Sequence, residues 1–126
     1  MKITDFLSRK HKPIVDLQSL CTIFTNNPLK QECYRLLIEE VANSKQPYFL
    51  NTFRRKYAKE ERYKDASENK WMFHCPMISE VWKSCFELGI LQRKRRGGEV
   101  RLSKKFSSML QSISEYWTNY VEAKKA

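Results

Sequence analysis

The feature that most constrains the fold is a charged, glycine-punctuated segment near the carboxyl end, residues 89–103. Its pattern is typical of a β-hairpin, because adjacent glycines between two short apolar stretches supply the positive φ angles that tight turns need. A loop of two or four residues places Leu91, Val100 and Leu102 on one face, whereas a loop of three would separate Leu91 from Leu102. We therefore expect an even loop and a hairpin with one face on a core.

Four consecutive cations mark the tip of this predicted hairpin: Arg93, Lys94, Arg95 and Arg96. They would project beyond the buried face, where they can meet a polyanion. The alternative is an ordinary solvated hairpin whose basic residues protect its edges from pairing.

The segment before the hairpin, residues 77–88, has the periodicity of an amphipathic helix. Pro76 precedes it, where a missing N–H costs little, and Gly89 follows it, where helices commonly end in a left-handed residue. Its apolar stripe comprises Ile78, Val81, Trp82, Cys85 and Leu88.

A helix that ends at a glycine, followed by a charged hairpin and a further apolar helix, resembles the winged-helix family over roughly residues 28–122. The resemblance implies an α+β, mainly helical fold: a three-helix core with a β-hairpin wing, here with extra amino- and carboxyl-terminal helices. We expect a peptide-like head at 1–12 and a single domain at 13–126, with its core at about 28–105 and a terminal helix at 106–123.

Upstream of the hairpin, periodicity predicts helices at 14–24 and 29–43, a short strand at 48–50, and a helix at 52–64 capped by Asn51. The side chains expected to face the core are Leu29, Cys33, Leu36, Leu37, Val41, Phe53, Tyr57, Trp71 and Phe73.

The charge of the chain points to a polyanionic partner. Lys and Arg number 24 against 14 Asp and Glu among 126 residues, a net charge of +10. Nucleic acid is therefore the first expectation, and an acidic protein or a membrane surface is the second. The cations gather on the predicted helix at 52–64 and on the hairpin, and the expected nucleic-acid contacts are Arg54, Arg55, Lys56, Lys59, Arg62, Arg93, Lys94, Arg95, Arg96, Arg101 and Lys104. The alternative is that both faces are merely solvated.

In winged-helix proteins the third helix usually reads bases in the major groove. Here the predicted outward residues of that helix carry two anions against one cation, which disfavours approach to phosphates; they are Ser79, Glu80, Lys83, Ser84 and Glu87. We therefore expect non-enzymatic, backbone-dominated binding of double-stranded DNA, by a transcriptional regulator or a replication or repair accessory. The alternative is a protein-interaction subunit of a larger nucleic-acid-processing complex.

Nothing in the sequence indicates catalysis, a cofactor or a metal site. No two of the four cysteines have the close spacing of zinc ligands, and the two histidines have no apparent catalytic partner. Cys33 and Cys85 are expected as small core residues, which suits a reducing cytoplasm or nucleus. No apolar run is long enough to predict a membrane span.

The two ends of the chain suggest protein partners. The predicted terminal helix has more apolar surface than one small domain needs, so Tyr116, Trp117 and Tyr120 are expected to form a homodimer or dock a partner chain. The alternative is that the helix at 14–24 covers them.

Residues 3–7, Ile-Thr-Asp-Phe-Leu, resemble the peptide that docks on sliding clamps, with Ile3 as the aliphatic plug and Phe6 as the first aromatic. The usual glutamine would precede Met1, and Leu7 stands where a second aromatic is usual. We prefer the alternative, which is either a frayed terminus or a helix start that packs Phe6 and Leu7 into the domain.

Overall fold

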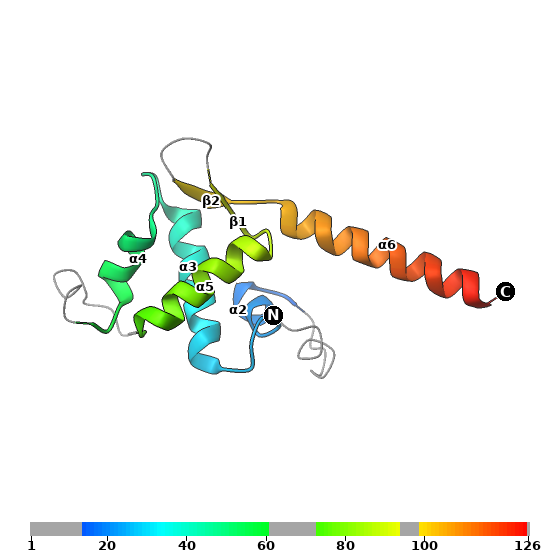
Figure 1. Ribbon diagram of the computed structural model, residues 1–126, viewed down its shortest axis with the longest axis horizontal. Helices are drawn as coiled ribbons and strands as arrows, with labels where there is room; N and C mark the ends of the chain where they lie inside the picture. Colours follow the sequence, from blue (N-terminus) through cyan, green and yellow to red (C-terminus); the bar gives the residue numbers. More distant parts are fainter. Residues whose placement is uncertain (1–13, 61–72, 94–98, 126) are drawn as a thin grey trace.

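The structure, a computed structural model, describes residues 14–60, 73–93 and 99–125. The described part is α+β and mostly helical, with one antiparallel hairpin (Figure 1). In chain order its elements are α2 (Leu17–Cys21), α3 (Pro28–Asn43), α4 (Leu50–Tyr57), α5 (Cys75–Glu87), β1 (Leu91–Arg93), β2 (Val100–Leu102) and α6 (Lys105–Lys125).

Local capping sets where the first helices begin. Asn27 starts α3, because its side chain accepts hydrogen bonds from the N–H groups of Leu29 and Lys30, at 3.0 and 3.3 Å. The predicted cap of α4, Asn51, is wrong: the helix begins at Leu50, two residues earlier than expected, and Phe49 is its N-cap. The Asn51 side chain instead accepts a hydrogen bond from Arg54 at 3.2 Å.

The predicted helix at 52–64 is too long, since α4 ends at Tyr57. There Ala58 is extended and pairs with Phe73 in a parallel bridge, in which Lys59 N–H donates to the Phe73 carbonyl at 2.9 Å. The bridge holds the Phe73 ring against Phe53, whose ring centroid is 6.5 Å away. The helix therefore ends where the backbone pairs with Phe73, a residue distant in the sequence. Helical periodicity alone does not predict this end.

The hairpin pairs Leu91 with Leu102 and Arg93 with Val100. The six residues at 94–99 between the strands are more than the two or four expected, but the number is even. The three apolar side chains therefore share a face as predicted, although Leu102 remains 42% exposed. The predicted strand at 48–50 is reduced to one bridge, in which Val100 N–H donates to the Tyr48 carbonyl at 3.2 Å.

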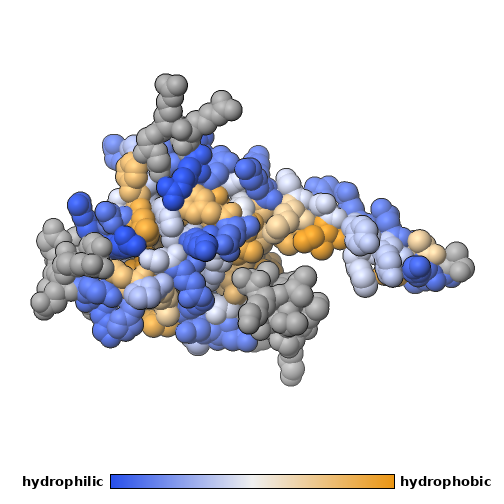
Figure 2. Space-filling model, viewed as in Figure 1, coloured by the Kyte–Doolittle hydropathy of each residue, from blue (hydrophilic) through white to orange (hydrophobic). Residues whose placement is uncertain are grey.

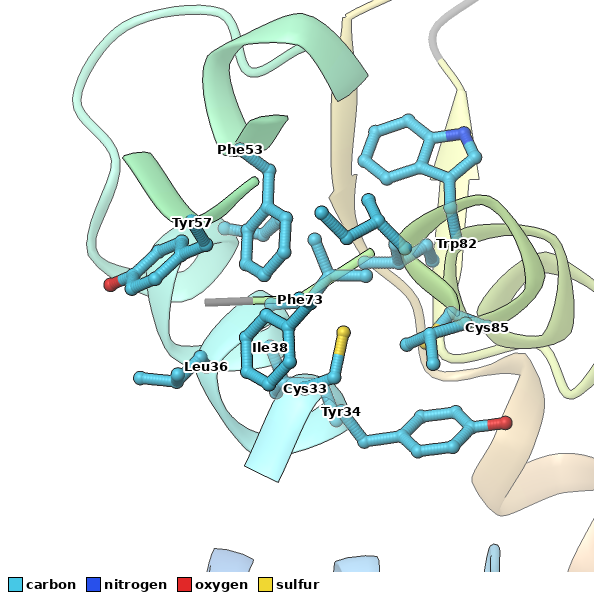
Figure 3. Close-up of a cluster of buried hydrophobic side chains, with 14 of the residues drawn as sticks. Cys33, Tyr34, Leu36, Ile38, Phe53, Tyr57, Phe73, Trp82 and Cys85 are labelled. Carbon is cyan, nitrogen blue, oxygen red and sulfur yellow. The ribbon is translucent and has the colours of Figure 1, made fainter. Parts of the chain in front are cut away.

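The core lies among α3, α4 and α5, against the base of the hairpin (Figure 3). Cys33 and Cys85 are fully buried within it, as predicted. The prediction for Leu29 is wrong, because this first-turn residue of α3 is 38% exposed. Of the other expected core residues, Leu36, Leu37, Val41, Phe53, Tyr57, Phe73, Ile78, Val81 and Trp82 are buried, Leu88 is half-buried, and Trp71 lies outside the described residues.

Gly89 ends α5 in the left-handed region, with φ of 76°. Its N–H donates to the Phe86 carbonyl at 3.1 Å and the N–H of Ile90 donates to the Cys85 carbonyl at 2.9 Å. This pair of hydrogen bonds is a Schellman motif. The Gly89 carbonyl in turn accepts from Phe106 N–H at 3.0 Å, so the same residue fixes the start of α6.

Helix α6 leaves the body as an arm, and the carboxyl terminus lies at its far end (Figure 1). Its bounds contain the predicted helix at 106–123. The predicted helix at 14–24 is shorter than expected, at Leu17–Cys21. Phe24 beyond it meets the first turn of α6, where its ring centroid lies 5.9 Å from that of Phe106. Further along the arm Trp117 is 61% exposed, so the alternative that this amino-terminal segment covers the aromatic residues is wrong.

Candidate nucleic-acid interface

A groove of about 550 Å³ opens between the amino half of α4, α5 and the hairpin. Each of the three elements contributes to it, so it is formed by the tertiary fold and not by one helix. Its lining comprises Phe49, Leu50, Asn51, Thr52, Arg54, Arg55, Trp82 and Arg93. The groove therefore combines three guanidinium groups with two aromatic rings.

Two of the three arginines are held by neighbouring side chains. Arg54 donates to Ser79 Oγ at 3.0 Å and to Asn51 at 3.2 Å, which ties α4 to α5. Arg93 lies over the Phe86 ring, with its guanidinium carbon 4.9 Å from the ring centroid. These contacts orient the charges without neutralising them, because none of the partners is an anion.

Arg55, the third arginine of the groove, is exposed on α4. The amino end of α4 also opens here, since Phe49 caps it without a side-chain hydrogen bond. Helix amino ends carry partial positive charge and attract anions. Every charge on the lining thus has the sign that favours phosphate.

Two further predicted contact residues lie away from the groove. Lys56 points to the other side of α4, where its ammonium is 2.9 Å from the Glu40 carboxylate. Arg101 pairs with Gln92 across the hairpin, and because side chains alternate along a strand it lies on the face opposite Arg93.

The other residues predicted to contact nucleic acid do not line the groove in the described part of the structure. Lys59 follows the end of α4 and Lys104 precedes α6, and both are exposed. Four further cations, Arg62, Lys94, Arg95 and Arg96, lie outside the described residues, as do Ile3, Phe6 and Leu7 of the clamp-like peptide.

The outer face of α5 is less charged in the fold than its sequence suggests. Glu80 forms an ion pair with Lys30 of α3, and Lys83 lies 3.9 Å from Glu87. Ser84, expected to be exposed, is buried and accepts a hydrogen bond from the Tyr34 hydroxyl at 2.7 Å. This face is therefore close to neutral and gives phosphates little attraction.

Sequence reasoning missed the aromatic part of the groove. Phe49 is 42% exposed beside the arginines, whereas the contacts predicted from the sequence were all Arg and Lys side chains. Alternation along residues 48–50 could have found it, because a buried Tyr48 sends the next side chain outward. Trp82 also lines the groove, although it is 94% buried. Nothing in the sequence distinguishes it from the other core residues of α5, so its place at the groove could not be predicted.

Burial also determines the state of the thiols. It raises the pKa of Cys21 and of Cys33 to about 12, and it raises the pKa of Cys85 further. These side chains are therefore protonated at neutral pH, whereas thiol nucleophiles and metal ligands act as thiolates. Within the described ranges, no three His, Cys, Asp or Glu side chains gather as metal ligands would.

No protein-family model matches the chain, and neither does any curated protein or solved structure. No described helix combines the length and apolar character needed to cross a membrane.

Proposed function

We propose that this chain is a winged-helix protein that binds double-stranded DNA without catalysing a reaction, as a transcriptional regulator or a replication or repair accessory. The observation that carries the proposal is the convergence of Arg54, Arg55 and Arg93, from two distant segments, on one groove with no described acid in its lining. Arginine suits phosphate because its planar fork donates two parallel hydrogen bonds.

The order of elements supports the winged-helix assignment. Three helices, α3, α4 and α5, precede a hairpin in the position of the wing, and Tyr48 adds a third stretch of backbone to that hairpin. The hairpin brings Arg93 into the lining of the groove. The next three residues in the sequence, Lys94, Arg95 and Arg96, are also cations and lie outside the described residues; we propose that they contact the same duplex backbone.

The same charges imply weak dependence on DNA sequence. Groove arginines that contact phosphates position a protein on DNA but do not read bases. The four cysteines are buried as thiols, and this use of cysteine as a core residue suits a reducing cytoplasm or nucleus. A protein-interaction role, the second candidate, is favoured by the exposed aromatic residues of α6 and is compatible with DNA binding.

The test compares two charge reversals in a fluorescence-anisotropy titration of a labelled random duplex. Arg55→Glu removes a groove cation, and Lys83→Glu makes the same change on the outer face of α5; both side chains are exposed. We expect Arg55→Glu to weaken binding at least about tenfold at low salt and Lys83→Glu to change it about twofold or less. An equal or larger effect of Lys83→Glu would move the contact to α5 and overturn the groove.

The wing is tested separately with Arg95→Ala/Arg96→Ala. If these residues contact phosphates, the variant should bind all duplex sequences more weakly and reduce the salt slope by about one to two. Unchanged affinity at low salt would remove the wing from the interface and leave the groove alone.

A further inference from the structure

Helix α6 exposes a continuous apolar face that no other described element covers. Met109, Leu110 and Ile113 are 38, 44 and 56% exposed, and the rings of Tyr116, Trp117 and Tyr120 are 70, 61 and 45% exposed (apolar residues of the arm are visible in Figure 2). No residue of α6 is buried, along 21 residues of helix. A helix with so little cover in its own domain needs another source of tertiary contact, because helical propensity alone rarely stabilises this length in water.

The face has the spacing of a coiled-coil seam. Leu110, Ile113, Trp117 and Tyr120 follow one another at intervals of three, four and three residues, and Phe106 continues the repeat toward the body. We call Leu110, Ile113, Trp117 and Tyr120 the α6 seam. Stacking stiffens it, since the Trp117 and Tyr120 rings lie 5.8 Å apart and 15° from parallel.

The charges of α6 leave the seam free for a like partner. Glu115 and Glu122 lie on the opposite face of the helix at 100° per residue. The positions that flank the seam carry no charged side chain: they are Ser107, Ser114 and Val121 on one side and Met109, Tyr116 and Ala123 on the other. A second copy would thus meet no repulsion between charged flanks. A partner chosen by charge would instead require complementary charges along these flanks.

The exposed area is about what a small dimer needs. At about 200 Å² per ring, the three aromatic side chains leave roughly 350 Å² open per copy, and the three aliphatic ones add roughly 250 Å². Two copies together therefore offer about 1,200 Å², the lower end of specific interfaces.

We propose that α6 forms a two-fold antiparallel dimer with α6 of a second copy. Glu115 is the midpoint of the helix, and the seam is symmetric about it: Leu110 faces Tyr120 of the partner copy, and Ile113 faces Trp117 of the partner copy. Full overlap of the two helices then pairs each aromatic ring with an aliphatic side chain.

Antiparallel pairing also has an electrostatic advantage. It places the two basic bodies at opposite ends of a rod about 30 Å long, from 1.5 Å per residue. A parallel pair would bring Trp117 against Trp117, Lys124 against Lys124, and two bodies of like charge to the same end. The proposal goes beyond DNA binding, and its test needs no nucleic acid.

The first test measures mass by light scattering on the intact chain up to about 100 μM. We expect twice the mass of one chain, and we expect Ile113→Glu to give the monomer. Ser108→Glu, which adds the same side chain on the opposite face, should leave the dimer intact. Circular dichroism confirms folding of both variants. A monomeric intact chain, or a dimer that survives Ile113→Glu, would overturn the proposal.

The second test determines the orientation. Leu110→Cys and Tyr120→Cys proteins are mixed in equal amounts and oxidised, and the masses of the disulfide-linked products are measured. The native cysteines are buried and do not compete. Antiparallel pairing predicts mixed dimers joined between positions 110 and 120. Like-with-like dimers from Leu110→Cys alone would show a parallel pair and overturn the antiparallel arrangement.

Discussion

Replacing Gly89 by alanine should destabilise the fold by about 2–4 kcal/mol, because three costs fall on one residue. The left-handed backbone, with φ of 76°, costs an alanine about 1–2 kcal/mol. A Cβ at this position would also lie 2.9 Å from Lys105 Cβ and 2.9 Å from Phe106 N, inside normal contact. Relief requires the start of α6 to move, which breaks the 3.0 Å hydrogen bond from Phe106 N–H and costs about 1 kcal/mol more.

Denaturant unfolding of the wild type and Gly89→Ala measures this difference as a change in the free energy of unfolding. Gly89→Asn separates the causes, because asparagine tolerates the left-handed region but still carries a Cβ. We expect it to recover about 1 kcal/mol of the loss and no more. A cost below about 1 kcal/mol for Gly89→Ala would refute the reasoning, and full recovery by Gly89→Asn would refute its steric part.

Three further predictions concern hydrogen-bonded side chains and the cysteine thiols. Tyr34→Phe should cost about 1–2 kcal/mol by leaving Ser84 Oγ buried without its donor, and a double-mutant cycle with Ser84→Ala should give a coupling of about 1 kcal/mol; additive single effects would contradict this. The Cys75 N–H donates to the Glu60 carboxylate at 2.9 Å, and this hydrogen bond lowers the pKa of Glu60. Below about pH 5 the unfolded chain therefore binds more protons than the folded one, and the free energy of unfolding decreases as the pH falls. In Glu60→Gln this decrease should be smaller when unfolding is measured across the acidic range. An unchanged dependence of the free energy of unfolding on pH would argue against the role of Glu60. The four cysteines should react with a thiol reagent only after unfolding, because all four are buried; rapid labelling of any native thiol would be inconsistent with the core.

Patterns within a single element were predicted well from the sequence. The stripe that placed Cys33 and Cys85 in the core, and the glycine that predicted a left-handed helix end, depend on spacing within a few residues. The structure confirms both. The hairpin face that joins Leu91 and Val100 was predictable for the same reason, since alternation needs only an even loop.

Features that depend on distant segments were not predicted. The end of α4 at Tyr57 follows from the pairing of Ala58 with Phe73, fifteen positions along the chain. Ser84 looked exposed because its partner, the Tyr34 hydroxyl, comes from another helix. The groove has the same origin: the arginines were predicted as contacts, but which of them share a surface is set by how α4 packs on α5 and the hairpin.

The central claim is that the groove of this protein binds the phosphates of double-stranded DNA. Its most direct test is the affinity of the intact chain for a short random duplex, measured by anisotropy across a range of salt concentrations. Contacts from Arg54, Arg55 and Arg93 alone predict a slope of log K against log salt of about −3 or steeper, since each neutralised phosphate contributes about −0.9. A slope near zero, or no binding to duplex at about 50 mM salt, would contradict the account.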